Sequence, residues 1–310
     1  MRMVARSKSM PAKLARNFRR YKYIYIMAIP VVIYYLIFMY WPMYGAQIAF
    51  KQYSPGKGIV GSPWVGFSHF EKFFRSFYLV RLLRNTLLIS LYSLLFSFPA
   101  PIILALLLNE LRSNRFKRCV QTISYLPHFI SVMVVCGMII DFTRSDGLIN
   151  DIIAMFGGTR QTMLLNPAMF RSIYIISDIW QGVGWGSIIY LSALTGIDSQ
   201  QYEAAVIDGA GRFQKMLHVT LPGIAPTIVI MLIMRIGQIM NVGYEKIILL
   251  YNGNTYETAD VISSFVYRKG LVEADYGYST AIGLFNSTVN LLLLLAANTV
   301  SRKVSETSLW

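Results

Sequence analysis

Residues 85–109 read NTLLISLYSLLFSFPAPIILALLLN, a run of 25 residues without one charged side chain. An α-helix rises about 1.5 Å per residue and the hydrocarbon core of a bilayer is about 30 Å thick, so about 20 apolar residues cross it. The run therefore predicts a membrane-spanning helix. It also directs attention to other runs of the same kind.

Five further runs meet the same requirement. Together the six expected spans are 24–44, 85–109, 121–140, 172–195, 223–242 and 278–300. Four of the six contain no charged residue. Prolines within several of them are compatible with spanning helices, because neighbouring helices or water satisfy the freed carbonyls. The expected fold class is an all-α polytopic membrane protein with six transmembrane helices.

The composition of the 310 residues agrees with this expectation, since 55% are hydrophobic and only 14% are charged. A soluble protein carries about a quarter of its residues as charged side chains. The two cysteines, Cys119 and Cys136, lie in or beside apolar runs, and we interpret them as core thiols rather than as a disulfide or a zinc site. The three histidines are scattered, and neither a catalytic nor a metal-binding constellation is visible.

The charge distribution predicts the orientation. The segment 1–23 contains eight basic residues and no acid, which is typical of a tail that stays in the cytoplasm. Six crossings return the C-terminal segment 301–310 to the same side. The net charge of +14 is thereby explained by the flanks of membrane helices, and a nucleic-acid partner is disfavoured. The run 24–44 is longer than the apolar region of a cleavable signal peptide, so we expect it in the mature protein.

The segment between the first two spans is rich in Gly, Pro and aromatic residues. Its second half, 70–83, predicts a helix that lies in the membrane interface. Phe73, Phe77 and Val80 are spaced to share one face of that helix.

The segment 196–222, between the fourth and fifth expected spans, does not have the composition of a simple loop. Asp198 or Ser199 can cap a helix that begins near Gln200, and Asp208-Gly209 is a turn signal that ends it. Residues 212–218 predict a second short helix, and Pro222 stands where the fifth span begins. The expected result is two short helices at an angle on the cytoplasmic side.

These residues resemble a known family. Glu203-Ala204-Ala205, then three residues, Gly209, nine residues, Val219 and Leu221-Pro222 match the EAA loop of membrane subunits of binding-protein-dependent ABC importers, E-A-A-x3-G-x9-I-x-L-P, with Val for Ile. Asp208 also fits the sugar and oligosaccharide branch. So do residues 64–67 (WVGF) and 241–245 (NVGYE). The chain is most similar to permease subunits of the maltose, alginate or pectin-oligosaccharide type.

The resemblance implies a type I importer permease in a bacterial cytoplasmic membrane. It implies that the EAA loop, residues 196–222, docks on an ATPase subunit through Glu203, Ala204, Ala205, Asp208, Gly209, Leu221 and Pro222. The expected partners are two ATPase subunits, a second and different permease subunit, an extracytoplasmic solute-binding protein and an oligosaccharide. The chain has no phosphate-binding loop, so no cofactor is expected on it, and ATP and Mg belong to the ATPases.

Two ionisable residues lie inside expected spans, where charges are costly and usually functional or paired. Asp178 in the fourth span and Arg235 in the fifth come at about the same depth. We expect them to be neighbours, either as a structural ion pair or in contact with an acidic or hydroxyl-rich solute.

Other polar and aromatic side chains in or near the spans are candidates for the solute pathway. They are Trp180, Gln181, Trp185, Gln238, Asn241, Tyr244, Asn286 and Asn290. Aromatic faces beside amides suit a sugar, although packing or anchoring at the interface explains the aromatic residues equally well. Asn286 and Asn290 are four residues apart and can instead hydrogen-bond between helices.

Two other function classes fit the sequence less well. A secondary transporter driven by an ion gradient usually needs more crossings or inverted repeats and has no use for an EAA loop. An integral membrane enzyme needs clustered catalytic side chains, which the sequence does not display. We therefore expect a transport subunit and not an enzyme.

Overall fold

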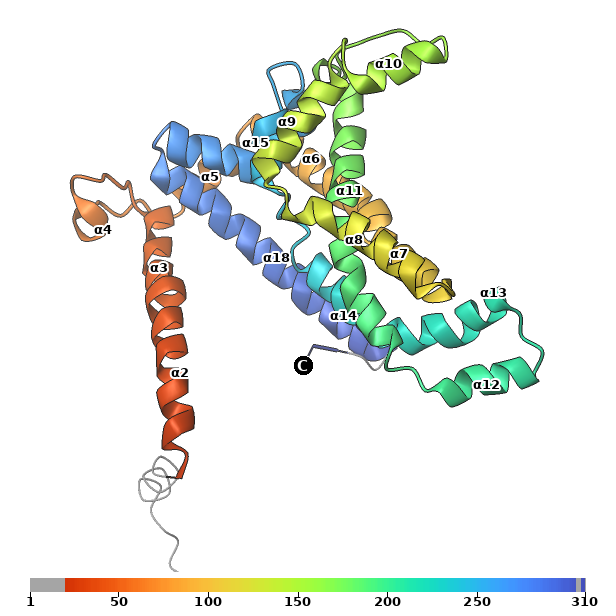
Figure 1. Ribbon diagram of the computed structural model, residues 1–310. Helices are drawn as coiled ribbons and strands as arrows, with labels where there is room; N and C mark the ends of the chain where they lie inside the picture. The colour runs from red at the N-terminus through yellow and green to blue at the C-terminus, as the bar shows by residue number, and fades with distance from the viewer. Residues whose placement is uncertain (1–19, 305–307, 310) are drawn as a thin grey trace, which may run out of the picture.

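The computed structural model describes residues 20–304 and 308–309, so most of the basic tail 1–23 lies outside the described residues. Within these ranges the chain is helical (Figure 1). The single strand-like pairing there is an isolated bridge between Lys51 and Trp64. The expected all-α class is confirmed.

The first expected span forms a continuous helix of 29 residues, Lys22–Phe50. It comprises α2 (Lys22–Tyr35), η1 (Leu36–Tyr40), α3 (Trp41–Met43) and η2 (Tyr44–Phe50). No residue of α2 is buried, and Figure 1 shows α2 standing apart from the other helices. The helix joins the rest of the protein at its far end, where η2 packs on α18 (Tyr276–Val304).

The expected interfacial helix 70–83 is wrong. After the short helix α4 (Gly58–Gly61), α5 (Ser68–Phe74) ends and α6 (Tyr78–Tyr92) begins only four residues later. Ser76 Oγ accepts a hydrogen bond from the backbone N–H of Tyr78, which starts the new helix. Because the helix is broken, Phe73 is buried whereas Phe77 and Val80 are exposed, and the three do not share a face.

The second span is longer than expected. α6 continues through the π-helical segment η3 (Ser93–Ser97) into α7 (Pro99–Glu110), so the helix runs over 33 residues from Tyr78 to Glu110. Pro99 and Pro101 follow the π-helical η3, whose wider turn makes room for prolines within a continuous helix.

The expected third span, 121–140, is not one helix. α8 (Asn114–Tyr125) and the 3₁₀ turn η4 (Leu126–Phe129) are followed by α9 (Val132–Thr143), and the two parts meet at a bend of 100°. Pro127 lacks an N–H, and Ser131 Oγ accepts from Val134 N to begin α9 in a new direction. Cys136 on α9 is buried but Cys119 on α8 is exposed, so only one cysteine is a core thiol.

After α10 (Leu148–Met155) and the turn η5 (Met163–Leu165), the fourth span is the 28-residue α11 (Pro167–Leu194). It packs closely on two neighbours through glycines. A Cβ on Gly184 would lie 2.0 Å from the Ser124 carbonyl oxygen, and one on Gly186 would lie 2.9 Å from Pro101. The helices therefore approach closely at Gly184 and Gly186 but not at Gly182, where a Cβ would meet nothing within 4 Å.

The second short helix and the fifth span are one helix, not two. α12 (Ser199–Ile207) is separate, but α13 (Arg212–Lys215), η6 (Met216–Thr220) and α14 (Leu221–Ile236) form a continuous helix of 25 residues. The π-helical η6 immediately precedes Leu221-Pro222, and this wider turn makes room for a proline within a helix. The span ends at Ile236 rather than at Val242.

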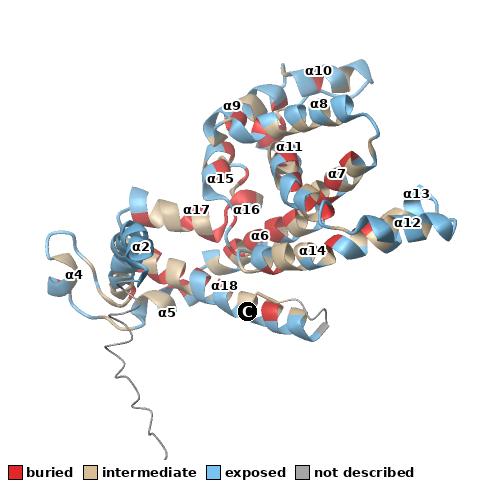
Figure 2. Ribbon diagram, turned by 60° about the horizontal axis from the view of Figure 1, so that its bottom comes forward, coloured by how far each residue is buried: buried red, intermediate tan, exposed pale blue. Residues whose placement is uncertain are grey.

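The chain then returns through three short helices to the last span. They are α15 (Tyr244–Leu250), α16 (Tyr256–Ala259) and α17 (Ile262–Tyr267), followed by η7 (Arg268–Val272) and α18. Figure 2 shows that buried residues concentrate where α6, α11, α15 and α16 meet, while α12 and α13 are exposed. Phe170, Ile247 and Val261 belong to the largest buried cluster.

Four described helices are long and apolar enough to cross a membrane, and the bent α8–α9 pair makes a fifth candidate. α11 is long enough but is not among them, since it carries Arg171 and Asp178 and is rich in Gly and Ser. Length and apolarity thus support a multi-pass protein without giving the number six.

Candidate functional site

A polar cavity of about 250 Å³ lies between α6, η3, α11 and the turn 237–243 that follows α14. Its polar side chains are Ser90, Ser93, Asp178, Arg235, Gln238 and Asn241. Four of the ten residues predicted for the solute pathway therefore come together. They meet because α14 ends at Ile236, so that the unwound turn carries Gln238 and Asn241 toward α11.

Asp178 and Arg235 are neighbours in this cavity, as their depths predict, but they are not an ion pair. Arg235 Nη2 donates to Ser93 Oγ instead. Within the described residues, Asp178 makes no hydrogen bond and no salt bridge. A carboxylate and a guanidinium thus line one cavity with capacity left for another polar group.

Three asparagines connect the turn 237–243 to α18. Asn241 Oδ1 accepts hydrogen bonds from Asn286 Nδ2 at 2.7 Å and from Asn290 Nδ2 at 3.1 Å. Asn290 Oδ1 in turn accepts from the backbone N–H of Met240 at 3.0 Å. The hydrogen bonding between helices that their spacing allows is therefore present. Asn286 Oδ1 is buried without a hydrogen-bond partner, which is costly unless a donor reaches it.

A larger cavity, about 740 Å³, lies on the other side of Asn286. It is bounded by the end of the first helix, α17, η7 and α18. Tyr244 and Asn286 line it together with side chains that the sequence analysis missed, namely Tyr267, Tyr276, Ser279 and Thr280. Tyr244 stacks on Tyr267 with ring centres 5.9 Å apart. Aromatic rings beside hydroxyls and an amide are the kind of lining that accommodates a sugar.

The three remaining candidates on α11 lie elsewhere. Trp180 faces a separate, almost wholly apolar cavity beside α9. Trp185 stacks on His128 with ring centres 4.5 Å apart, and Gln181 Nε2 donates to the Ile130 carbonyl at 3.2 Å. None of the three lines either polar cavity in this conformation. They hold the break between α8 and α9 against α11.

Lys246 is a further charge near the cavity that the sequence analysis did not single out. Its side chain is buried, and its ammonium lies 5.0 Å from the centre of the Tyr174 ring. Because α15 was not expected as a helix, nothing in the sequence indicated that Lys246 would point inward.

The EAA loop has the two-helix geometry that its residues predict. Asp198 Oδ1 caps α12 by accepting from Gln200 N at 2.9 Å. α12 ends at Asp208, and Gly209 has φ +78°, which favours glycine because it has no Cβ. Tyr202 OH lies 3.0 Å from Thr220 Oγ1 and ties α12 to η6.

The far end of this loop presents apolar side chains without a partner in the described chain. Ile207 is 86% exposed and Phe213 is 67% exposed, and Val206 is beside them. Glu203, Ala204 and Asp208 are exposed as well, and Ala205 is partly exposed. Leu221 and Pro222 lie apart from this surface, in the first turn of α14. Large exposed apolar side chains grouped in this way are typical of a surface that binds another protein.

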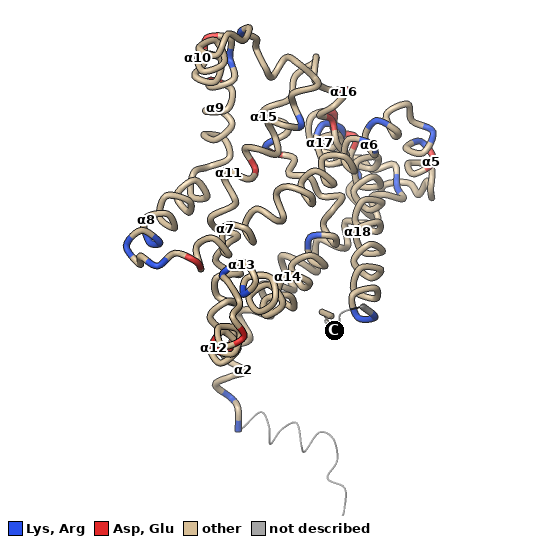
Figure 3. Tube along the Cα trace, turned by 90° about the vertical axis from the view of Figure 1, so that its right-hand side faces the viewer, with Lys and Arg blue, Asp and Glu red and all other residues tan. Residues whose placement is uncertain are grey.

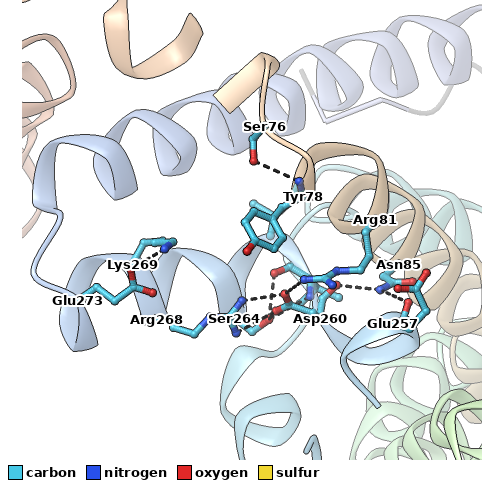
Figure 4. A network of polar contacts seen from close by, with 12 residues as sticks. Ser76, Tyr78, Arg81, Asn85, Glu257, Asp260, Ser264, Arg268, Lys269 and Glu273 are labelled. Carbon is cyan, nitrogen blue, oxygen red and sulfur yellow. Dashed lines mark hydrogen bonds and ion pairs between the residues drawn. The ribbon is translucent and has the colours of Figure 1, made fainter. Parts of the chain in front are cut away.

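The opposite end of the molecule contains a buried ionic network around Asp260 (Figure 4). Asp260 is fully buried and pairs with Arg81 at 3.1 Å and with Arg268 at 2.8 Å. Burial alone would lower the pKa of Arg268, but the hydrogen bonds and the charge of Asp260 raise it. The network joins α6 to α17. Its one sequence signal was an isolated acid among Ala259, Val261 and Ile262.

Comparison with known proteins gives consistent results. The family described as "Binding-protein-dependent transport system inner membrane component" matches residues 97–306. Protein LplB of Bacillus subtilis is 45% identical over 94% of this chain and 92% of its own. The polygalacturonan/rhamnogalacturonan transport system permease protein YteP of the same organism is 46% identical over 93% of this chain and 90% of its own.

Two solved structures are also similar. One is a bacterial ABC transporter involved in the import of the acidic polysaccharide alginate, with a TM-score of 0.88, 46% identity, and coverage of 94% of this chain and 99% of that one. The other is a bacterial alginate ABC transporter in complex with an alginate pentasaccharide-bound periplasmic protein, with a TM-score of 0.88 and 45% identity over 96% and 100% of the two chains.

Proposed function

Since the chain belongs to the family of binding-protein-dependent transport system inner membrane components and is an ABC transporter permease rather than an enzyme, we propose that it forms half of the pore of an ATP-driven importer of acidic oligosaccharides. The other half is a second, different permease subunit. Two ATPase subunits hold ATP and Mg, and an extracytoplasmic solute-binding protein delivers the cargo.

The orientation follows from the charges. The basic tail and both termini lie in the cytoplasm, together with α12 and α13. The six crossings are the helix Lys22–Phe50, the helix Tyr78–Glu110, the bent α8–α9 pair, α11, the helix Arg212–Ile236 and α18. α11 is about 42 Å long at 28 residues, which is enough to cross the core despite its two charges.

One observation carries the mechanism. The helix Arg212–Ile236 is continuous, so it connects the exposed EAA loop at one end with Arg235 at the other over about 37 Å. A displacement of the loop by an ATPase is then transmitted to the wall of the polar cavity along this one helix, which includes the π-helical η6 and Pro226. This continuous helix acts as a lever and suits alternating access, in which the cargo site opens to one side of the membrane while it is closed to the other.

The cargo class rests on the cavity and on the relatives. Arg235 and the amide NH2 groups of Gln238 and Asn241, which donate to no other described residue, offer donors to carboxylate and hydroxyl groups. The relatives' names refer to polygalacturonan and alginate, which are acidic. The pathway runs from the 740 Å³ cavity past Asn286 and Asn241 to the 250 Å³ cavity.

The test replaces the exposed apolar surface of the loop. In the double variant Ile207→Asp with Phe213→Asp, we expect an at least tenfold loss of ATPase co-purification and of cargo-stimulated ATP hydrolysis. The matched control is Met155→Asp on α10, which is equally exposed at the opposite end. Unchanged coupling in the double variant would contradict the proposal. So would uptake that survives ATP depletion, which a secondary transporter predicts.

A further inference from the structure

Two arginines at the end of the molecule opposite α12 have no acidic partner. Arg171 on α11 donates through Nε to the Thr258 carbonyl and through Nη2 to Asn85 Oδ1, and both acceptors are neutral. Arg84 on α6 is exposed and makes no hydrogen bond or ion pair with any described residue. Asn85, which accepts the hydrogen bond from Arg171, directly follows Arg84 in α6, so the two arginines lie on adjoining helices at the same end of the molecule.

The nearby acids do not neutralise this pair. The carboxylate of Asp260 is engaged by Arg81 and Arg268. The exposed side chain of Glu257 forms no salt bridge with Arg84 or Arg171 in the part of the chain that the structure describes. Figure 3 shows that basic residues gather near α6 and α5 at this end. An anionic group could therefore bind here without displacing a side chain.

An apolar groove of about 410 Å³ begins at Arg171 and runs between α11 and the α6–η3 helix. Its walls are Tyr92, Phe96, Ala168, Ser172, Ile175, Ile176 and Ile179. Phe96 and Ile176 are exposed, so the groove is open on the outside of the described helices.

The helix lengths place the arginines at the boundary of the hydrocarbon core. About ten residues on each side of a helix midpoint span the core. The midpoint of α11 (Pro167–Leu194) lies near residue 180, which places the boundary near residue 171. The midpoint of the helix Tyr78–Glu110 lies near residue 94, which places the boundary near residue 84. The groove below both arginines thus lies at the depth of the lipid tails.

We propose that this groove binds one anionic phospholipid, with its phosphate between Arg84 and Arg171 and one acyl chain along Ile176, Ile179 and Phe96. An anionic lipid matches both parts of the site. Its negatively charged headgroup faces the arginines at the boundary of the hydrocarbon core, and its acyl chain fills the apolar groove below them. A sugar would leave the groove empty, and a free anion would make no use of it. The inference requires only that these helices span the bilayer.

The headgroup test measures lipid binding to the purified full-length chain by native mass spectrometry. We expect dioleoylphosphatidylglycerol to bind at its tightest site at least tenfold more strongly than dioleoylphosphatidylcholine. Arg84→Gln, which breaks no contact within the chain, should weaken phosphatidylglycerol binding at least threefold, and Arg84→Gln with Arg171→Gln at least tenfold. Arg75→Gln, which lies outside the groove and pairs with Glu71, is the matched control and should have no effect.

The groove test separates a lipid from a free anion. Ile176→Trp fills the groove and should abolish tight binding of phosphatidylglycerol, whereas Ile188→Trp, exposed on the same helix, should not. Glycerophosphoglycerol, the headgroup without chains, should fail to compete at hundredfold excess. Equal binding of the two lipids, an unaffected Arg84→Gln variant, an unaffected Ile176→Trp variant or full competition by the headgroup alone would each overturn the proposal.

Discussion

The two ends of the helix bundle differ in how they are held. At one end, Asp260 is fully buried between Arg81 and Arg268 and joins segments almost 180 residues apart in sequence. At the other end, α12 has no buried residue, and the hydrogen bond between Tyr202 and Thr220 ties it to η6. Tertiary contacts hold the first end together. At the second end, α12 projects from the bundle beside the start of the helix Arg212–Ile236.

This difference suggests a division of roles. A lever needs a fixed part against which it works and a free part on which force acts. In the mechanism we propose, the Asp260 network is the first and the EAA loop the second. We therefore expect substitutions near Asp260 to reduce stability most and substitutions in the EAA loop to reduce it least, while the effect on coupling to the ATPase follows the opposite order.

The largest loss of stability is expected for Asp260→Asn. The change leaves the partly buried Arg81 and Arg268 beside a neutral amide, and breaking an ion pair whose acid is fully buried costs up to about 3–5 kcal/mol. Chemical unfolding in detergent would measure it. The control is Asp151→Asn, whose half-exposed pair with Arg160 contributes about 0–1 kcal/mol. A similar loss in the free energy of unfolding in the two variants would mean that the Asp260 network does not stabilise the fold more than an exposed ion pair does.

The next effect is expected in the middle of the bundle, at Gly184→Ala. The added Cβ would meet the Ser124 carbonyl oxygen at 2.0 Å, and overpacking of this kind costs about 1–3 kcal/mol. At Gly182 no atom lies within 4 Å of a Cβ, so Gly182→Ala should be neutral or stabilise the helix by up to about 1 kcal/mol. A stable Gly184→Ala protein would show that α8 is free to move away from α11.

A smaller effect is expected for Tyr202→Phe. The variant loses the hydrogen bond to Thr220 Oγ1, which contributes about 0.5–1.5 kcal/mol. Because the bond fastens only α12, we expect the loss in local hydrogen exchange of α12 rather than in global unfolding. Tyr23→Phe on the exposed first helix is the comparison, and it should leave exchange unchanged. A fall in global stability would show that α12 belongs to the core.

The smallest effect on stability is expected for Ile207→Asp alone. The side chain is 86% exposed, so replacing it should change the free energy of unfolding by less than about 0.5 kcal/mol. The same variant should nevertheless weaken ATPase binding. A clear destabilisation of the isolated chain would indicate that Ile207 packs within the permease and is not a docking residue.

Much of this architecture was predictable, because a bilayer leaves few choices. Uncharged runs of about 20 residues must be helical in lipid, and each expected span contains helix in the structure. The angle between α12 and α13 followed from Asp208-Gly209, since the backbone there needs positive φ. Asp178 and Arg235 could be placed at one depth by counting residues at constant rise.

Other features could not be obtained in this way. Residues 121–140 are as uncharged as residues 85–109, yet the helix breaks at Ile130-Ser131 and its two parts meet at 100°. The helix 70–83 had the right spacing, but Ser76 began a new helix and reversed the exposure of Phe73 relative to Phe77. The spacing of apolar residues shows which of them share a face if the segment is one helix. It does not show where a local hydrogen bond ends that helix and begins another.

The sequence by itself determined that this protein is helical, crosses a membrane several times and carries a two-helix EAA loop, because apolar length, charge asymmetry and turn residues act locally. Only the tertiary structure decided that Arg235 would bond to Ser93 rather than to Asp178, that Asn241 would gather two amides from α18, and that Asp260 would lie between two arginines. Those contacts depend on which faces of the helices pack against each other. That packing is determined by the shapes of side chains from helices far apart in the sequence, not by neighbouring residues in the chain.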